Sequence, residues 1–215
     1  MRTTTLETAV AAIPDGASLM VGGFMAVGTP ERIVDELVRQ RKRDLTVIAN
    51  DTARPGAGIG KLVTAKLVRR AIVSHIGTNP ETQQQMIAGE MEVELIPQGT
   101  LIERIRAAGY GLGGVLTPTG MGTVVEEGKR KIDVDGRDYL LEAPLRADFA
   151  LIQAFLADYL GNLTYVLTAR NFNPVIAMAA ATVIVDAEHV VPVGMIPPDH
   201  VMTPAPLVDY LVARP

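Results

Sequence analysis

Residues 18–38, SLMVGGFMAVGTPERIVDELV, decide the fold of this chain. The apolar run over residues 18–21 ends at two glycines, which predicts a buried strand that enters a tight loop. Thr29 and Pro30 then supply an N-cap and a first-turn proline for a helix. The apolar residues of that helix share one face: Ile33, Val34, Leu37 and Val38. The stretch therefore predicts a strand, a glycine-rich loop and a helix in direct succession.

The same alternation of strand and helix extends outward to both ends of the chain. Near the N-terminus, Thr4 and Glu7 have capping-box spacing and predict a first helix. Further strands are predicted at residues 45–49, 71–74, 93–96, 149–153 and 182–185. Helices are predicted between most of them, at residues 60–66, 80–88, 101–107 after the capping box Thr100 to Glu103, and 174–180 after Asn173. Such alternation implies parallel strands joined by crossovers.

One segment departs from this alternation. Residues 131–134 and 137–141 alternate polar and apolar side chains around Asp135-Gly136, a dipeptide typical of hairpin turns. The expected fold is therefore α/β, an open, mostly parallel sheet with helices on both faces and an inserted β-hairpin. No repeat, low-complexity tract or linker divides the chain, so we expect a single domain over residues 1–215.

The composition restricts the class of partner and of site. Of the 215 residues, 48% are hydrophobic and 20% are charged, as in soluble globular proteins. The formal net charge of −4 argues against a nucleic-acid partner, which would favour concentrated Lys and Arg. The chain has no cysteine, which excludes disulfides and thiol catalysis on this polypeptide. Neither the three widely spaced histidines nor the carboxylates have metal-ligand spacing, so no metal site is expected.

Signals for export or membrane insertion are absent from the sequence. Residues 1–13 contain no basic segment followed by an apolar block. No run approaches the roughly 18 apolar residues of a membrane span. We therefore expect no membrane partner and a cytoplasmic protein, with which the absence of cysteine is compatible.

Small and polar residues follow several of the predicted strands. They are Gly22-Gly23-Phe24, Asn50-Asp51, residues 75–79 and Gln98-Gly99. Ligands of open parallel sheets bind beyond the carboxyl ends of the strands. The sequence therefore predicts a site for a polar ligand at one edge of the sheet.

Two of these segments have both a chemical and a structural interpretation. Gly22 to Pro30 leads into a helix start, where backbone N–H groups and the helix dipole favour an anion. The glycines could equally serve only to permit a tight turn. The amide of Gln98 could donate a hydrogen bond to a developing oxyanion, or it could bond to nearby loop backbone. The residues alone leave both pairs of alternatives open.

A series of motifs runs in order through nearly the whole chain. They are Asp15-Gly16, residues 19–24 with Gly28 and Pro30, and residues 48–52, 74–79, 97–100, 117–120 and 169–173. In this order they resemble the motifs of family I CoA-transferase alpha subunits. The resemblance is strongest to the alpha subunits of bacterial acetate or acetoacetate CoA-transferases, and the succinyl-CoA:3-oxoacid enzymes are similar.

The resemblance implies an open α/β subunit that pairs with a beta subunit of related fold, as α2β2 or a larger assembly. Coenzyme A would be a substrate, and no cofactor would be permanently bound. In that family a glutamate attacks the acyl-CoA, which leads through an acyl-glutamyl anhydride to a glutamyl-CoA thioester. The glutamate belongs to a Ser-Glu-Asn-Gly motif of the beta half, which this sequence lacks. The chain alone is therefore expected to be inactive.

The resemblance also implies roles for individual residues. Gln98 matches the family glutamine that contributes to the oxyanion hole, which favours its catalytic interpretation. Asn50 matches a family asparagine near the thioester. The glycine-rich loop lines the site near the subunit boundary in the family, and its matching residues here are Gly22, Gly23, Phe24 and Gly28. These four residues and Asn50 are the expected substrate- or CoA-binding residues.

Two other functions fit an open α/β fold. A sugar-phosphate isomerase or deaminase of similar fold would also need an anion site, with its acid and base on this chain. A non-catalytic ligand-binding module, such as the effector domain of a regulator, would need no acid or base. A fused DNA-binding helix pair would indicate such a regulator, and none precedes the first predicted helix. For the transferase, the expected substrates are an acyl-CoA and a short-chain carboxylate or 3-oxoacid, and no local pattern specifies which.

Overall fold

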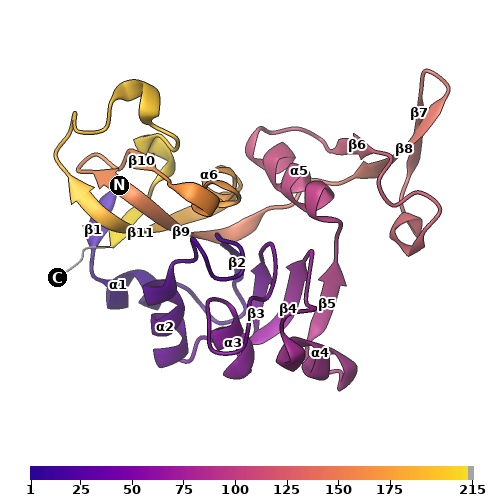
Figure 1. Cartoon of the computed structure of the whole chain (residues 1–215), viewed down its shortest axis with the longest axis horizontal. Coiled ribbons are helices and arrows are strands. Elements are labelled where there is room, and N and C mark those ends of the chain that lie inside the picture. The colour runs from indigo at the N-terminus through magenta and orange to yellow at the C-terminus, as the bar shows by residue number, and fades with distance from the viewer. Residues whose placement is uncertain (213–215) are drawn as a thin grey trace.

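A nine-stranded, almost entirely parallel sheet forms the centre of the protein (Figure 1). The structure is a computed structural model and describes residues 1–212. The strands lie in the order β1-β12-β11-β9-β2-β3-β4-β5 with parallel neighbours, and β10 pairs antiparallel with β9. Their bounds are β1 (Arg2–Thr4), β2 (Ser18–Val21), β3 (Leu45–Ile48), β4 (Val68–Val73), β5 (Glu92–Leu95), β9 (Ala147–Asp158), β10 (Leu163–Thr164), β11 (Ala180–Val191) and β12 (Tyr210–Val212). The predicted mostly parallel sheet is confirmed.

Helices cover both faces of this sheet, as predicted. They are α1 (Leu6–Ala11), α2 (Glu31–Arg39), α3 (Gly60–Thr64), α4 (Pro80–Ile87), α5 (Gln98–Gly109) and α6 (Asn173–Ile176). Successive side chains of a strand point to opposite faces. Accordingly, Leu19 and Val21 of β2 join a core with α1, α2 and α3, whereas Met20 joins a second core with α5 and α6. No described helix has the length and apolar character needed to cross a membrane.

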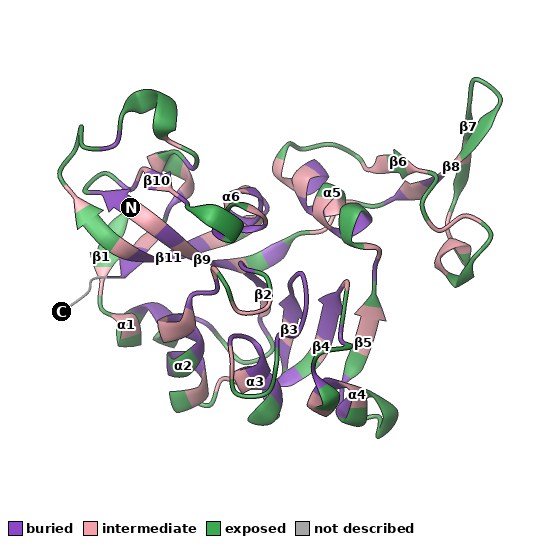
Figure 2. Ribbon diagram, in the orientation of Figure 1, coloured by how far each residue is buried: buried purple, intermediate pink, exposed green. Residues whose placement is uncertain are grey.

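A separate three-stranded antiparallel sheet extends from the body of the molecule (Figure 1). Its strands lie in the order β6 (Val115–Thr117), β8 (Arg137–Glu142) and β7 (Lys131–Val134). Asp135 and Gly136 both have positive φ (53° and 78°), as a type I′ hairpin turn requires. We refer to residues 115–142 as the arm, whose outer hairpin is largely exposed (Figure 2). The predicted hairpin is confirmed, and it belongs to this second sheet.

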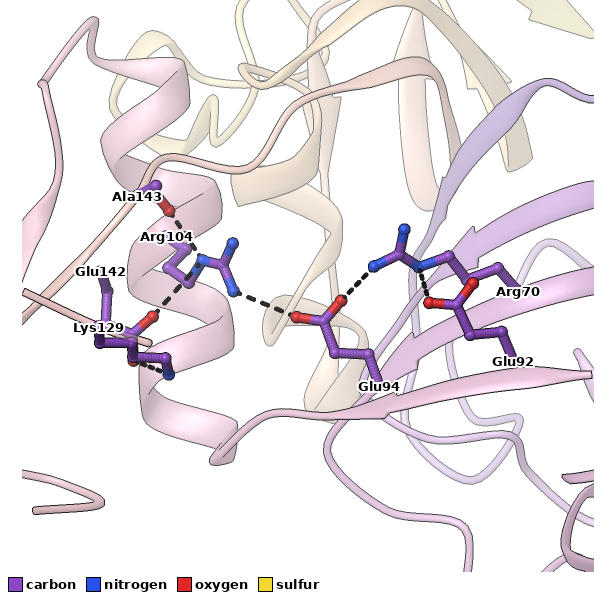
Figure 3. A network of polar contacts seen from close by, with 7 residues as sticks. All are labelled: Arg70, Glu92, Glu94, Arg104, Lys129, Glu142 and Ala143. Atoms are coloured by element: carbon purple, nitrogen blue, oxygen red, sulfur yellow. Dashed lines mark hydrogen bonds and ion pairs between the residues drawn. The ribbon is translucent and has the colours of Figure 1, made fainter. Parts of the chain in front are cut away.

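Charged side chains connect the arm to the main sheet through α5 (Figure 3). Arg104 of α5 donates from Nε to the Ala143 carbonyl (2.8 Å) and forms an ion pair with Glu94 of β5 (3.7 Å). It also pairs with Glu142 of β8 (3.9 Å), whose side chain is only 2% exposed and also contacts Lys129 (2.5 Å). A buried charge is costly without its partners, so this network fixes the arm relative to α5.

The N-terminal capping box was predicted one residue too early. Thr4 ends β1, which pairs in parallel with β12 at the opposite end of the chain. Thr5 caps α1 instead, by accepting a hydrogen bond from the Thr8 N–H (3.2 Å). The pairing of two three-residue strands, far apart in sequence, overrides the local capping preference of Thr4.

The other predicted caps are also wrong. α2 begins after Pro30 with no side-chain cap, because the Thr29 hydroxyl donates elsewhere. α5 begins at Gln98, three residues before the prediction, so Thr100 lies inside the helix. Asn173 is the first residue of α6 and not its cap. Among the strands, β9 and β11 are twelve residues long and extend well beyond the predicted ranges. The short strands β1, β6, β10 and β12 were not predicted, and the other predicted elements agree to within a few residues.

Candidate active site

Loops after four neighbouring strands meet at the carboxyl edge of the main sheet. They follow β2, β3, β4 and β5, and they contain the glycine loop (residues 22–30), Asn50 and the start of α5 at Gln98. An isolated parallel bridge between Asp51 and His75 continues the pairing of β3 and β4 beyond their ends. The structure therefore brings the predicted site residues to the edge where ligands of such folds bind.

A buried asparagine holds the glycine loop against α6. Asn173 is fully buried and donates from Nδ2 to the Gly28 carbonyl (2.9 Å). Its Oδ1 accepts a hydrogen bond from the Gln153 N–H (3.1 Å). A Cβ on Gly22 would lie 1.8 Å from that oxygen, so the close approach requires glycine.

The other glycines of the loop also have packing roles. Gly28 has φ +77°, and a Cβ there would lie 2.7 Å from Ala169 Cα. Gly23 has φ +104°, and its Cβ would lie 2.4 Å from Thr29 Oγ1. That hydroxyl is buried and donates to the Gly22 carbonyl (3.0 Å). These contacts favour the structural interpretation of the three glycines, and their contact with substrate stays a prediction.

The tip of the glycine loop is a tight turn between Phe24 and Val27. The two residues exchange backbone hydrogen bonds (3.0 and 2.9 Å), and Met25 and Ala26 between them have φ values of 50° and 71°. A left-handed conformation costs a residue with a Cβ roughly 1–2 kcal/mol. The turn presents Phe24 and Val27, which are 44% and 55% exposed, as apolar side chains at the edge of the sheet.

Asp51, shortly after β3, joins this turn to the neighbouring loop. Its side chain is 3% exposed. Oδ2 accepts a hydrogen bond from the Met25 N–H (3.0 Å), and Oδ1 accepts one from the Ala53 N–H (2.6 Å). Asp51 was predicted at this edge without a role of its own. The available signal was an aspartate next to Asn50 at a strand end.

Asn50 is buried between β3 and the end of β4. Its side-chain Oδ1 accepts a hydrogen bond from Ser74 Oγ (3.0 Å), and its carbonyl accepts one from the Ser74 N–H (2.9 Å). These bonds fix the direction of the Asn50 side chain. Its predicted contact with a thioester stays a prediction.

Gln98, in contrast, is exposed at the start of α5. The helix begins after Pro97 with no side-chain cap, and within residues 1–212 the Gln98 amide makes no hydrogen bond. The amide is therefore not used by nearby loop backbone, which was the structural alternative. A pocket of about 440 Å³ begins at the next residue, and it is lined by Gly99, Thr100, Glu103, Val115, Leu116, Thr117 and Thr119.

The sequence matches the family described as Coenzyme A transferase over residues 3–214. This chain belongs to the coenzyme A transferase family. The alpha subunit of an acetate CoA-transferase from Escherichia coli (strain K12) is 57% identical over 97% of this chain and 94% of that one. The alpha subunit of an acetoacetyl-CoA:acetate/butyrate CoA transferase from Clostridium acetobutylicum is 51% identical over 94% of this chain and 92% of that one.

Solved structures share the fold of this coenzyme A transferase chain. An acyl-CoA transferase from Escherichia coli O157:H7, in a thioester complex with CoA, gives a TM-score of 0.87 at 25% identity. The match covers 99% of this chain and 47% of that one, so the present chain spans about half the length of that relative. A decarboxylase gives a TM-score of 0.83 at 30% identity, over 100% of this chain and 83% of that one. The resemblance and the α/β fold expected from it are confirmed.

Proposed function

We propose that this chain is the alpha subunit of a heteromeric CoA-transferase that moves CoA between an acyl-CoA and a short-chain carboxylate, with acetate and acetoacetate as the first candidates. The names of the two similar alpha subunits support both the subunit and the substrates. The observation that carries the proposal is an open amide donor, Gln98, at an edge where Asp51 has both oxygens bound to backbone N–H groups. Such an edge can stabilise an oxyanion but needs a nucleophile from elsewhere.

A beta subunit would supply that nucleophile. The sequence contains no Ser-Glu-Asn-Gly motif. The matching part of the solved acyl-CoA transferase is less than half of its chain, which leaves a second half of similar size for the remaining machinery. The proposed assembly is α2β2 or larger. Coenzyme A enters it as a substrate, and the proposal needs no metal or permanently bound cofactor.

The proposed reaction is nucleophilic catalysis by a carboxylate. The glutamate of the partner subunit attacks the acyl-CoA carbonyl, the C–S bond breaks, and an acyl-glutamyl anhydride and CoA thiolate form. The thiolate then attacks the glutamyl carbonyl of the anhydride. The first carboxylate departs as the leaving group, and the glutamyl-CoA thioester forms. A second carboxylate takes the CoA by the reverse steps. Each tetrahedral intermediate carries an oxyanion, to which the Gln98 amide would donate a hydrogen bond.

Family membership favours this function over the two alternatives. A sugar-phosphate isomerase would need its acid and base on this chain, and a ligand-binding module would need no partner with a nucleophile. Both alternatives place the whole function on a single polypeptide. Of the three hypotheses, only the transferase predicts that two different subunits must assemble before any activity is measured.

Reconstitution tests the proposal. This chain, its beta-type partner and the assembled pair are assayed separately for transfer of CoA from acetyl-CoA or acetoacetyl-CoA. The acceptors are acetate, acetoacetate, succinate, butyrate and 3-oxoadipate. In each assay the acceptor acid differs from the acid carried by the acyl-CoA donor. We expect transfer only by the pair, fastest between acetate and acetoacetate. Transfer by this chain alone would contradict the division of labour, and a pair inactive with every combination would contradict the activity.

A further inference from the structure

The turn over residues 24–27 has a conformation that its own sequence does not favour. Two-residue hairpin turns in which both central residues have positive φ favour Asn, Asp and Gly. Here the central residues are Met25 and Ala26, with φ values of 50° and 71°. Neither side chain can stabilise a left-handed conformation by hydrogen bonding locally, as Asn and Asp can. Neighbouring residues must therefore impose this turn.

Three contacts from the loops after β3 and β4 impose it. The Asp51 carboxylate accepts the Met25 N–H (3.0 Å). The backbone at Gly58 packs so closely that a Cβ there would lie 2.9 Å from the Cβ of Ala26. The Thr78 hydroxyl lies 3.4 Å from the Met25 sulfur. Of these, the Asp51 contact acts on the backbone of the turn itself.

The Asp51 carboxylate is arranged to hold backbone and not to react. Its two oxygens accept N–H groups from different loops, those of Met25 and Ala53. Hydrogen bonds to an ionised group are short and strong. Because the carboxylate is buried, its removal would leave both N–H groups without acceptors. Each oxygen thus binds a backbone N–H group and the side chain is buried, which favours a positioning role for Asp51 over attack on a substrate.

We propose that Asp51 is a positioning residue for CoA transfer. Its carboxylate holds the turn so that Phe24 and Val27 extend at the same edge of the sheet as Gln98. This inference rests on the proposed function. Without the carboxylate, Met25 and Ala26 relax toward ordinary φ values and the tip moves, while the two sheets and the assembly with the beta subunit persist. The loss is therefore expected in kcat and not in the yield of assembled complex.

The test uses the assembled complex of this chain with its beta subunit. Asp51→Ala is compared with Asp51→Asn, which keeps one acceptor oxygen, and with the triple variant Met25→Gly/Ala26→Gly/Asp51→Ala. We expect kcat to fall about 10- to 100-fold in Asp51→Ala and less in Asp51→Asn. Glycine adopts positive φ without steric cost. The kcat of the triple variant should therefore be at least about threefold higher than that of Asp51→Ala. A purely structural role would not predict this recovery.

Asp148 provides a matched control at the opposite edge of the sheet. Its Oδ2 accepts the N–H (2.8 Å) and the hydroxyl (2.7 Å) of Ser18, where β2 begins. Asp148→Ala removes an exposed carboxylate that also accepts two hydrogen bonds, in this case from the start of β2, and its complex should keep the native kcat. Native kcat in Asp51→Ala, or a loss shared equally by Asp148→Ala and unchanged by the glycine pair, would overturn the positioning role alone. No transfer by the native complex would overturn this inference together with the proposed function.

Discussion

The glycine loop and the start of α5 lie at the same edge of the sheet, but their polar groups differ in how they are satisfied. In the glycine loop, Asn173, Thr29 and Asp51 satisfy the backbone from within the chain. At the start of α5 no side chain caps the helix, and Gln98 is exposed. Proteins pair nearly all of their buried polar groups. These bonds favour a structural role for the glycine loop, whereas the exposed Gln98 amide is open to the role in catalysis that we propose for it.

Removing the open amide should have the largest effect. Gln98→Ala in the assembled complex is expected to lower kcat about 10²- to 10³-fold, because one oxyanion donor is lost. Assembly, checked by size-exclusion chromatography, should not change. Gln84, an exposed glutamine of α4, is the control, and Gln84→Ala should keep the native rate. Full activity in Gln98→Ala would remove this residue from the mechanism.

Removing hydrogen bonds from the glycine loop should mainly affect stability. Asn173→Ala leaves the Gln153 N–H and the Gly28 carbonyl without their partner and creates a cavity. The free energy of unfolding should fall by about 2–4 kcal/mol, measured by urea denaturation. A decrease below about 1 kcal/mol would show that the glycine loop does not depend on this asparagine.

The start of α5 lacks a cap, so its orientation should depend on contacts further along the helix. Arg104→Met removes the ion pairs to Glu94 and Glu142 and should lower the free energy of unfolding by about 1–2 kcal/mol. Hydrogen exchange should rise in the arm and at the start of α5. Arg106→Met is the matched control, because its pair with Glu103 is exposed and contributes little. Equal exchange in the two variants would contradict a special role of the network.

The smallest effect is expected at the opposite edge of the sheet, and it depends on pH. The hydroxyl and the N–H of Ser18 hydrogen bond to Asp148 and lower the pKa of its carboxyl below the usual 3.8. The stability from these bonds is therefore fully present above pH 3.8 and is lost as the pH falls through the lower folded-state pKa. Because Asp148 is exposed, Asp148→Asn should cost less than about 1 kcal/mol at neutral pH.

Unfolding measured from neutral pH down to about pH 2 checks this last prediction. The difference between the native chain and Asp148→Asn should shrink as the pH falls. A difference that persists at the acid end would show that the ionised carboxylate is not its source.

Much of the fold follows from local pattern, and several of the exceptions have identifiable causes. The apolar run at residues 18–21 coincides with β2, and Asp135-Gly136 forms the expected turn. The missed strands β1 and β12 are three residues long and pair across the whole chain, so no local periodicity marks them. Thr4 has a good capping sequence but belongs to β1, which pairs with β12. The Thr29 hydroxyl donates to the Gly22 carbonyl, seven residues earlier, and does not cap α2. At Thr4 and Thr29, another partner takes the group that a helix cap would use.

The candidate site was predicted less completely. The rule that ligands bind at strand carboxyl ends placed Asn50 and Gln98 at one edge. The packing roles of Gly22 and Gly28 depend on Asn173, more than 140 residues away, which no motif connects to them. The role of Asp51 depends on where the Met25 N–H lies after folding. Such roles come from tertiary geometry and leave no pattern in the sequence.

The central claim is that this chain completes a site whose nucleophile belongs to another polypeptide. The most direct test incubates the assembled complex with acyl-CoA, stops the reaction and measures the mass of each subunit. The account predicts a covalent CoA adduct on a glutamate of the beta subunit, with the mass of this chain unchanged. A CoA adduct on this 215-residue chain would contradict it.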